Sequence, residues 1–230
     1  MPSPHMLNIL IHVSAGTVTI LLGLIILSRR KGDRWHVRLG RAAVASASIS
    51  VATALLGAFV FRAKFDLMGA SLLVGYHLWA GLRALSLKDR GRRLADLAPA
   101  LGVVVGGGGL WAIYRYGAPV NWSPGLVMGT IGGMLTYGGY DVMRTLYPAG
   151  WRTALNPAEH AFRMVSVIGA MISVAVGALV RTNYTLPLPL IVSAVFGVAG
   201  LVFAVRAARK ALGVVPSVAL KARLNADSEL

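Results

Sequence analysis

The chain has 230 residues and a formal net charge of +15, and it combines 56% hydrophobic residues with 13% charged residues. This balance leaves too little polar surface to cover a soluble core, so the composition predicts a membrane protein and argues against soluble domains. Cysteine is absent, which excludes disulfides, thiolate nucleophiles, iron–sulfur clusters and covalently attached c-type haem.

Seven uncharged stretches follow one another along the chain. Most are long enough, or nearly so, to cross a hydrocarbon core of about 30 Å as a helix that rises about 1.5 Å per residue. The third is long enough only if Arg83 extends its guanidinium to the headgroups, which lengthens the apolar body to Leu87. We therefore predict an all-α fold, a single transmembrane helical bundle over residues 1–230. Its seven helices are expected at about 7–28, 35–61, 67–88, 95–116, 123–145, 158–181 and 185–207.

Several helix ends have recognisable signals. Asp33 is placed to cap the second helix, and Asn156 before Pro157 is a start signal for the sixth. The first helix has no Lys or Arg before it and is followed at once by Arg29, the reverse of a cleavable signal sequence, so we expect it to be retained. Four consecutive glycines at 106–109 favour a kink or local unwinding in the fourth helix, since each costs about 1 kcal/mol against alanine.

The basic residues are distributed unevenly between the two ends of the predicted helices. Of the 23 Lys and Arg residues, the side that holds the amino terminus has only Arg62, Lys64, Arg115 and Arg181. The positive-inside rule therefore places the amino terminus outside and the carboxyl terminus in the cytoplasm. Because the charges lie in short loops beside the membrane, anionic lipid accounts for them, and we predict no nucleic-acid partner.

The histidines are the main candidates for a functional site in this chain. His12 belongs to a stripe of small and polar residues that should face the bundle and not the lipid. The stripe consists of Asn8, His12, Gly16, Thr19 and Gly23. His77 is expected near the middle of the membrane, where an ionisable group is a candidate for a functional site. The alternative is a neutral histidine that is hydrogen-bonded across helices.

A second group of candidate residues should gather at the cytoplasmic ends of the helices. Its members are His36, His160, Asp141 and Glu159. Histidine and carboxylate ligands at one depth could hold a divalent metal or relay protons. In the alternative interpretation, Glu159 pairs with Arg163 and Asp141 pairs with Arg144 in the headgroup layer.

The histidines also suggest haem b or a divalent metal as a cofactor. The candidate ligands are His12, His36, His77 and His160. A haem shared by His12 and His77 is disfavoured, because their depths differ by roughly 8 Å at about 1.5 Å per residue. Residues 185–205 contain neither lysine nor histidine, which excludes a retinal protein and a zinc hydrolase with a histidine pair in the last helix.

Small residues form three helix faces, as expected where helices approach closely in lipid. The faces are Gly125, Gly129 and Gly133; Ser46, Ser50, Thr53 and Gly57; and Gly169, Ser173 and Gly177. We expect these faces to pack against neighbouring helices of the bundle. They could also bind a membrane protein partner or a second copy of the chain.

A set of short motifs extends over most of the chain, roughly residues 7 to 205. The motifs are His12, Gly16 and Gly23; Lys31-Gly32, His36 and Gly40-Arg41; Gly81-Leu82-Arg83-Ala84-Leu85; Tyr140-Asp141; and His160 with Arg163-Met164. Together they resemble a family of bacterial membrane proteins catalogued as domain of unknown function 2306. The resemblance implies a multi-pass protein of the bacterial cytoplasmic membrane, with His12, His36 and His160 as family features and no established activity. His77 matches no family position.

Three hypotheses for the function follow. The first is a non-hydrolytic membrane protein that binds haem or a metal through histidine, for redox chemistry or cofactor handling. The second is a small transporter or proton-coupled permease, in which His12, His77 and Asp141 line the path. The third is a structural or assembly partner that acts through its glycine faces.

Overall fold

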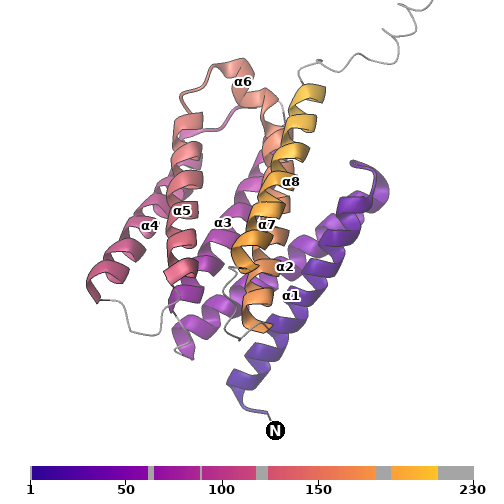
Figure 1. Cartoon of the computed structure of the whole chain (residues 1–230). Helices are drawn as coiled ribbons and strands as arrows, with labels where there is room; N and C mark the ends of the chain where they lie inside the picture. Colours follow the sequence, from indigo (N-terminus) through magenta and orange to yellow (C-terminus); the bar gives the residue numbers. More distant parts are fainter. Residues whose placement is uncertain (1, 62–64, 89, 118–123, 180–187, 212–230) are drawn as a thin grey trace, which may run out of the picture.

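The computed structural model describes residues 2–61, 65–88, 90–117, 124–179 and 188–211, and this part of the chain is helical apart from short connections (Figure 1). The elements are α1 (Pro4–Ser28), α2 (Arg34–Val60), α3 (Phe65–Leu87), η1 (Leu94–Asp96), α4 (Leu97–Gly117), α5 (Pro124–Arg144), α6 (Ala149–Ala154), α7 (Asn156–Leu179) and α8 (Leu188–Ala211). The seven predicted helices are confirmed, and their described ends differ from the prediction by at most four residues. The short elements η1 and α6 were not predicted.

The long helices form hairpins around α3. α1 packs against α2, α4 against α5 and α7 against α8, while α3 contacts α2, α5 and α7. Figure 1 shows α1 and α2 on one flank of the molecule and α4 and α5 on the other. A buried apolar cluster of Ala47, Val74, Leu78 and Val167 lies where α2, α3 and α7 meet. α3 is therefore the element against which the other parts of the bundle are placed.

Five helical segments of the described chain are long and apolar enough to cross a membrane. They are α1, α2, η1 with α4, most of α7 and most of α8. α1 and α8 leave most of their large apolar side chains exposed, as expected for helices that face lipid. α3 and α5 contact each other near the centre of the bundle. These features indicate a multi-pass membrane protein.

The connection between α1 and α2 is held by polar contacts at both helix ends. The Asp33 carboxylate accepts a hydrogen bond of 2.6 Å from the backbone N–H of His36, which confirms the predicted cap of α2. The Lys31 ammonium donates to the carbonyl oxygens of Ile26 and Leu27 at 2.8 and 3.0 Å and so satisfies the last turn of α1. Partial burial lowers the pKa of Lys31.

The glycine run at 106–109 does not unwind α4. The helix is continuous from Leu97 to Gly117, so the predicted local unwinding is wrong, while the alternative of a kink stays a prediction. A Cβ at Gly107 would lie 3.0 Å from the Cβ of Met134, which shows that α4 approaches α5 closely at this point. Glycine at 107 therefore serves the packing of the two helices.

Two of the three predicted small-residue faces pack as expected. On α2, the Ser46 hydroxyl lies 2.8 Å from that of Thr19, and the carbonyl oxygen of Thr53 accepts from the Asn8 amide at 3.1 Å. On α7, the Ser173 hydroxyl donates to the carbonyl oxygen of Pro189 of α8 at 3.0 Å. Hydroxyl and amide groups thus join α1 to α2 and α7 to α8.

The α5 face does not pack within the bundle over its whole length. Gly133 lies against Leu73 of α3, whereas no described residue of another helix lies within 4 Å of a Cβ added at Gly125 or Gly129. The expectation that all three pack against neighbouring helices of the bundle is therefore wrong for Gly125 and Gly129. The described α5 contacts α4 through Gly138 instead.

We expect Gly138→Ala to lower the free energy of unfolding by up to about 2 kcal/mol. A Cβ at Gly138 would lie 3.0 Å from the carbonyl oxygen of Ala100 and 2.8 Å from Cγ2 of Val104. Overpacking of this kind costs about 1–3 kcal/mol, whereas alanine gains only about 1 kcal/mol over glycine in a helix. Equilibrium unfolding in detergent micelles measures the difference. Gly129→Ala on the same helix is the matched control and should not destabilise; equal destabilisation of both variants would contradict the close approach.

Candidate functional site

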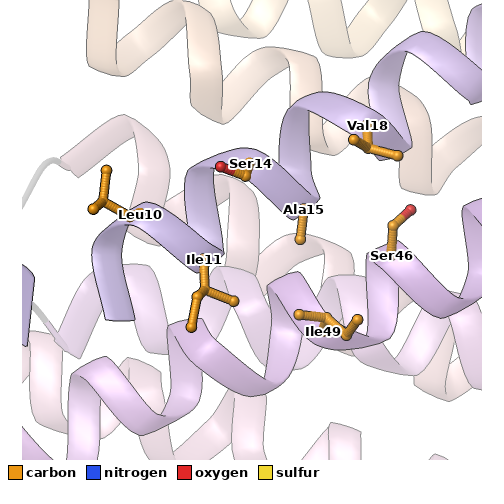
Figure 2. Close-up of a pocket in the computed structure, with 7 residues that line it drawn as sticks. All are labelled: Leu10, Ile11, Ser14, Ala15, Val18, Ser46 and Ile49. Carbon is orange, nitrogen blue, oxygen red and sulfur yellow. The ribbon is translucent and has the colours of Figure 1, made fainter. Parts of the chain in front are cut away.

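His12 lies in the seam between α1 and α2. Its Nδ1 is 2.9 Å from the carbonyl oxygen of Ser50, to which the ring donates, and the Thr53 hydroxyl lies 3.4 Å from the same nitrogen. The lipid-facing side of this seam is a shallow apolar depression in which Ile11 of α1 faces Ile49 of α2 (Figure 2). The seam thus satisfies the imidazole with backbone and hydroxyl groups and places no charged side chain around the depression.

His36 and His160 are close enough to interact electrostatically at the beginning of α2 and α7. The Nδ1 of His160 lies 3.0 Å from the carbonyl oxygen of Gly81, which fixes its ring against α3. Within the described residues, no group of three or more His, Asp and Glu side chains is placed to hold a metal ion. The predicted metal site of His36, His160, Asp141 and Glu159 therefore has no support from the geometry.

Asp141 and Glu159 instead belong to a buried ionic cluster between α3, α5 and α7. The cluster consists of Arg92, Asp141, Arg144, Glu159 and Arg163, each at most 5% exposed. Asp141 and Arg144 come from the last turns of α5, Glu159 and Arg163 from the first turns of α7, and Arg92 from the connection between α3 and η1. Three segments that are distant in the sequence thus place their charges in one apolar environment.

Ion pairs connect every member of the ionic cluster. The Arg92 guanidinium lies 2.5 Å from Glu159 and 3.2 Å from Asp141. Arg163 lies 2.9 Å from Asp141 and 3.8 Å from Glu159, and Arg144 pairs with Glu159. The predicted pair of Glu159 with Arg163 is confirmed, but it is one contact of a network. Each carboxylate is shared by at least two arginines, as buried charges in an apolar environment require.

Aromatic residues and His77 border the ionic cluster towards the middle of α3. The Tyr76 hydroxyl donates to Asp141. The Arg163 guanidinium lies 5.5 Å from the centre of the Tyr76 ring and 5.2 Å from that of Tyr137, within cation–π range. Its Nη1 is 3.4 Å from Nδ1 of His77, whose ring meets the Tyr137 ring edge-on at 4.4 Å. His77 is therefore a buried neighbour of Arg163, and His12 lies in a different seam.

Asn156 fixes the connection that contains Arg92. Its side-chain oxygen accepts from Arg144 at 2.8 Å, while its amide donates to the carbonyl oxygens of Lys88 and Arg90 at 2.7 and 3.1 Å. The first residue of α7 thus holds the backbone on the amino-terminal side of Arg92. Asn156 was predicted only as a helix start signal, and the structure adds this bridging role.

Arg92 is the cluster member that sequence reasoning missed, and the role of Arg144 and Arg163 was underestimated. The charge rule assigned all three to the cytoplasmic headgroup layer. One signal could have found them: the chain contains only eight Asp and Glu residues, and two of these lie at the ends of apolar helices on the side that is rich in arginine. Carboxylates so placed need cationic partners.

Among the described residues, the ionic cluster has an excess of positive charge. Three guanidinium groups face two carboxylates, and the neighbouring Tyr76 and Asn156 are neutral. Nε and Nη1 of Arg92 are buried, and neither donates a hydrogen bond to any described residue. Such an arrangement can accept an anion, because guanidinium groups bind carboxylate and phosphate oxygens through paired N–H donors.

Comparisons with models of protein families, with curated proteins and with solved structures found no significant match.

We expect Asp141→Asn to destabilise the fold by about 3–5 kcal/mol, the usual cost of breaking a buried ion pair. The substitution keeps the shape of the side chain but leaves Glu159 as the only carboxylate for three arginines. Urea unfolding in detergent measures the effect. Asp33→Asn is the matched control, because asparagine caps a helix about as well as aspartate and the cap of α2 should survive. If Asp141→Asn lowers the free energy of unfolding as little as Asp33→Asn does, these ion pairs are not important for stability.

Proposed function

We propose that this multi-pass membrane protein binds an anionic group, a phosphate or a carboxylate, at the ionic cluster. The observation that supports the proposal is the state of Arg92, which keeps two buried donor atoms without a partner among the described residues. The two carboxylates with which it pairs are also shared with other arginines of the cluster. An uncompensated buried charge is costly, so an anion beside Arg92 would stabilise the cluster. The expected ligand is a small solute that presents two or three oxygens to a guanidinium fork.

The position of the ionic cluster supports entry of the ligand from the arginine-rich end of the bundle. Arg92 belongs to the connection between α3 and η1, in which the side chains of Lys88, Arg90 and Arg93 are exposed. The charge bias predicts that this end faces the cytoplasm. Exposed cations beside a buried cationic site raise the local concentration of anions. A small carrier of anionic solutes is the class of protein that this arrangement suits.

The earlier transporter hypothesis needs a different set of residues. It placed His12, His77 and Asp141 along one path, but His12 is bonded within the α1–α2 seam, while His77 and Asp141 both contact Arg163. We propose that Arg92, Arg144 and Arg163 replace His12 in that role. The bacterial cytoplasmic membrane remains the proposed location. Membership of the family of domain of unknown function 2306 also remains a proposal, and the motifs that support it include Asp141 and Arg163 of the cluster.

Binding of haem or a divalent metal by histidine is a less favoured proposal. His12 and His160 each use one ring nitrogen on a backbone carbonyl oxygen, and His77 lies against Arg163. A guanidinium beside an imidazole opposes a metal cation by electrostatic repulsion. The pair His36 and His160 is the remaining candidate, and the described residues offer it no third His, Asp or Glu ligand.

We expect inorganic phosphate to raise the melting temperature of the purified protein in a saturable way, because a ligand that binds only the folded state stabilises it. Sodium chloride at equal ionic strength should not reproduce the effect. Arg92→Lys keeps the positive charge but removes the guanidinium fork, and we expect it to weaken phosphate binding about tenfold or more in isothermal titration calorimetry.

Arg38→Lys on the exposed face of α2 is the matched control for that experiment and should bind phosphate as the original protein does. Acetate and succinate test the carboxylate class under the same conditions. If none of these anions stabilises the original protein beyond the chloride reference, the proposal is wrong.

A second candidate function, assembly with another membrane protein or a second copy, is favoured by the outer face of α5. Gly125, Gly129 and Gly132 are exposed, and an added Cβ at each of them would meet nothing within 4 Å. Their spacing of four and three residues forms a seam along which a second helix can approach closely. No partner is needed to explain the fold, so the seam can be tested separately from stability.

We expect Gly129→Leu to reduce assembly while the protomer stays folded, because the side chain enters open space on the protomer and blocks a close helix approach. Single-molecule photobleaching or cross-linking in liposomes measures the assembled fraction. Gly109→Leu, which also enters open space but on α4, should leave the fraction unchanged. If the wild-type protein is monomeric at all lipid dilutions, the seam is not a site of self-assembly.

A further inference from the structure

We propose that a groove between α2, α3 and α4 binds an acyl chain of an anionic phospholipid, whose headgroup lies on Arg83 and Arg93. The proposal concerns a site next to the ionic cluster and does not depend on anion binding there. It follows from three properties of the groove: its lining, its length and the charges at one of its ends.

The groove has a volume of about 400 Å³ and is open along one side. This volume lies within the range of ligand sites in proteins. The lining is almost entirely apolar, with Leu55 from α2, Leu72, Tyr76 and Trp79 from α3, and Pro99 and Val103 from α4. An open apolar groove in a membrane protein faces hydrocarbon chains, so an acyl chain matches the lining.

The groove extends over about two helical turns. On α3 it is bordered from Leu72 to Trp79, and on α4 from Pro99 to Gly106, which corresponds to about 10 Å along each helix axis. This length is about a third of the hydrocarbon thickness of a membrane. The groove therefore suits part of one chain from one leaflet.

Cationic side chains stand at the arginine-rich end of the groove. Arg83 follows Trp79 by one helical turn, and its Nε pairs with Asp96 at 2.6 Å, so its guanidinium bridges α3 to η1 just beyond Pro99. The Arg83 side chain is 31% exposed. Arg93, whose backbone N–H donates to the same Asp96 carboxylate at 2.8 Å, is exposed. A negative charge at the head of a ligand in the groove would therefore be attracted to this end.

An anionic phospholipid has both features, and it is a regular component of membranes. A free phosphate ion matches the arginines but not the apolar lining, and a zwitterionic lipid matches the lining but gains less from Arg83 and Arg93, because its choline cation offsets the charge of its phosphate. The apolar depression on α1 and α2 in Figure 2 lacks this cationic end, since Ser14 and Ser46 supply its only polar side chains. We therefore infer specific lipid binding in the groove between α2, α3 and α4, and ordinary lipid contact at the depression on α1 and α2.

Glycine positions on α4 allow a test with a matched control. A Cβ at Gly102 meets nothing within 4 Å, and Gly102 lines the groove, so Gly102→Leu fills the groove without a backbone clash. Gly109 lies two turns further along the same face of α4, is equally open and does not line the groove. Gly109→Leu adds the same side chain outside the site.

The proteins are purified in detergent, mixed with phosphatidylglycerol or phosphatidylcholine of equal chain length, and analysed by native mass spectrometry. We expect the original protein and Gly109→Leu to retain phosphatidylglycerol in preference to phosphatidylcholine, and Gly102→Leu to lose this retention. Arg93→Gln should reduce the preference for phosphatidylglycerol about fivefold, which corresponds to the contribution of one basic residue near an anionic lipid.

Three results would overturn the proposal: equal retention of the two lipids by the original protein, equal retention by Gly102→Leu and Gly109→Leu, or an unchanged preference in Arg93→Gln. Phosphate calorimetry on Gly102→Leu separates this site from the ionic cluster. Normal phosphate binding with lost lipid retention shows that the groove acts by itself. Lipid retention without any phosphate binding leaves the groove in place and removes the proposed function of the cluster.

Discussion

The pairing of buried charges is the constraint on which the arrangement of the bundle depends. Asp141 and Glu159 stand at the ends of apolar helices, where an unpaired carboxylate would cost several kcal/mol. Both carboxylates can be satisfied together only if the end of α5, the start of α7 and the connection after α3 meet at one point. The ion pairs therefore determine which helix ends converge, and dispersion contacts of small residues determine how closely the helices approach elsewhere.

The number and limits of the helices could be predicted because they depend on one-dimensional properties: the length of an apolar stretch and the charges that end it. The site could be predicted only in part. The depth of Asp141 and Glu159 and the pair of Glu159 with Arg163 follow from helical spacing. The inward direction of Arg92 does not, because a charge in a loop can face the headgroups or turn into the bundle. Its direction is set by Asn156, which holds the backbone before it from another helix.

The histidines and glycines show the same limit of sequence reasoning. A histidine in an apolar helix needs a partner, but the sequence cannot say whether that partner is a ligand or a backbone carbonyl; for His12 and His160 it is a carbonyl oxygen. Helical spacing groups Gly125, Gly129 and Gly133 on one face without saying which part of that face meets another helix. Of these three, Gly133 alone lies against another described helix, where it meets Leu73 of α3.

Tyr76 links the two proposed sites. Its ring lines the groove between α2, α3 and α4, while its hydroxyl donates to Asp141 in the ionic cluster. A chain in the groove would restrict the ring and so favour the position in which the hydroxyl stays on Asp141. An anion that binds Arg92 or Arg163 would weaken the ion pair of that arginine with Asp141. It would thereby change the electrostatic environment of the Tyr76 hydroxyl. Binding free energies at two such sites are coupled reciprocally, so any effect of lipid on anion affinity must equal the effect of anion on lipid affinity. Any coupling between the two proposed sites would therefore act through the described Tyr76 side chain.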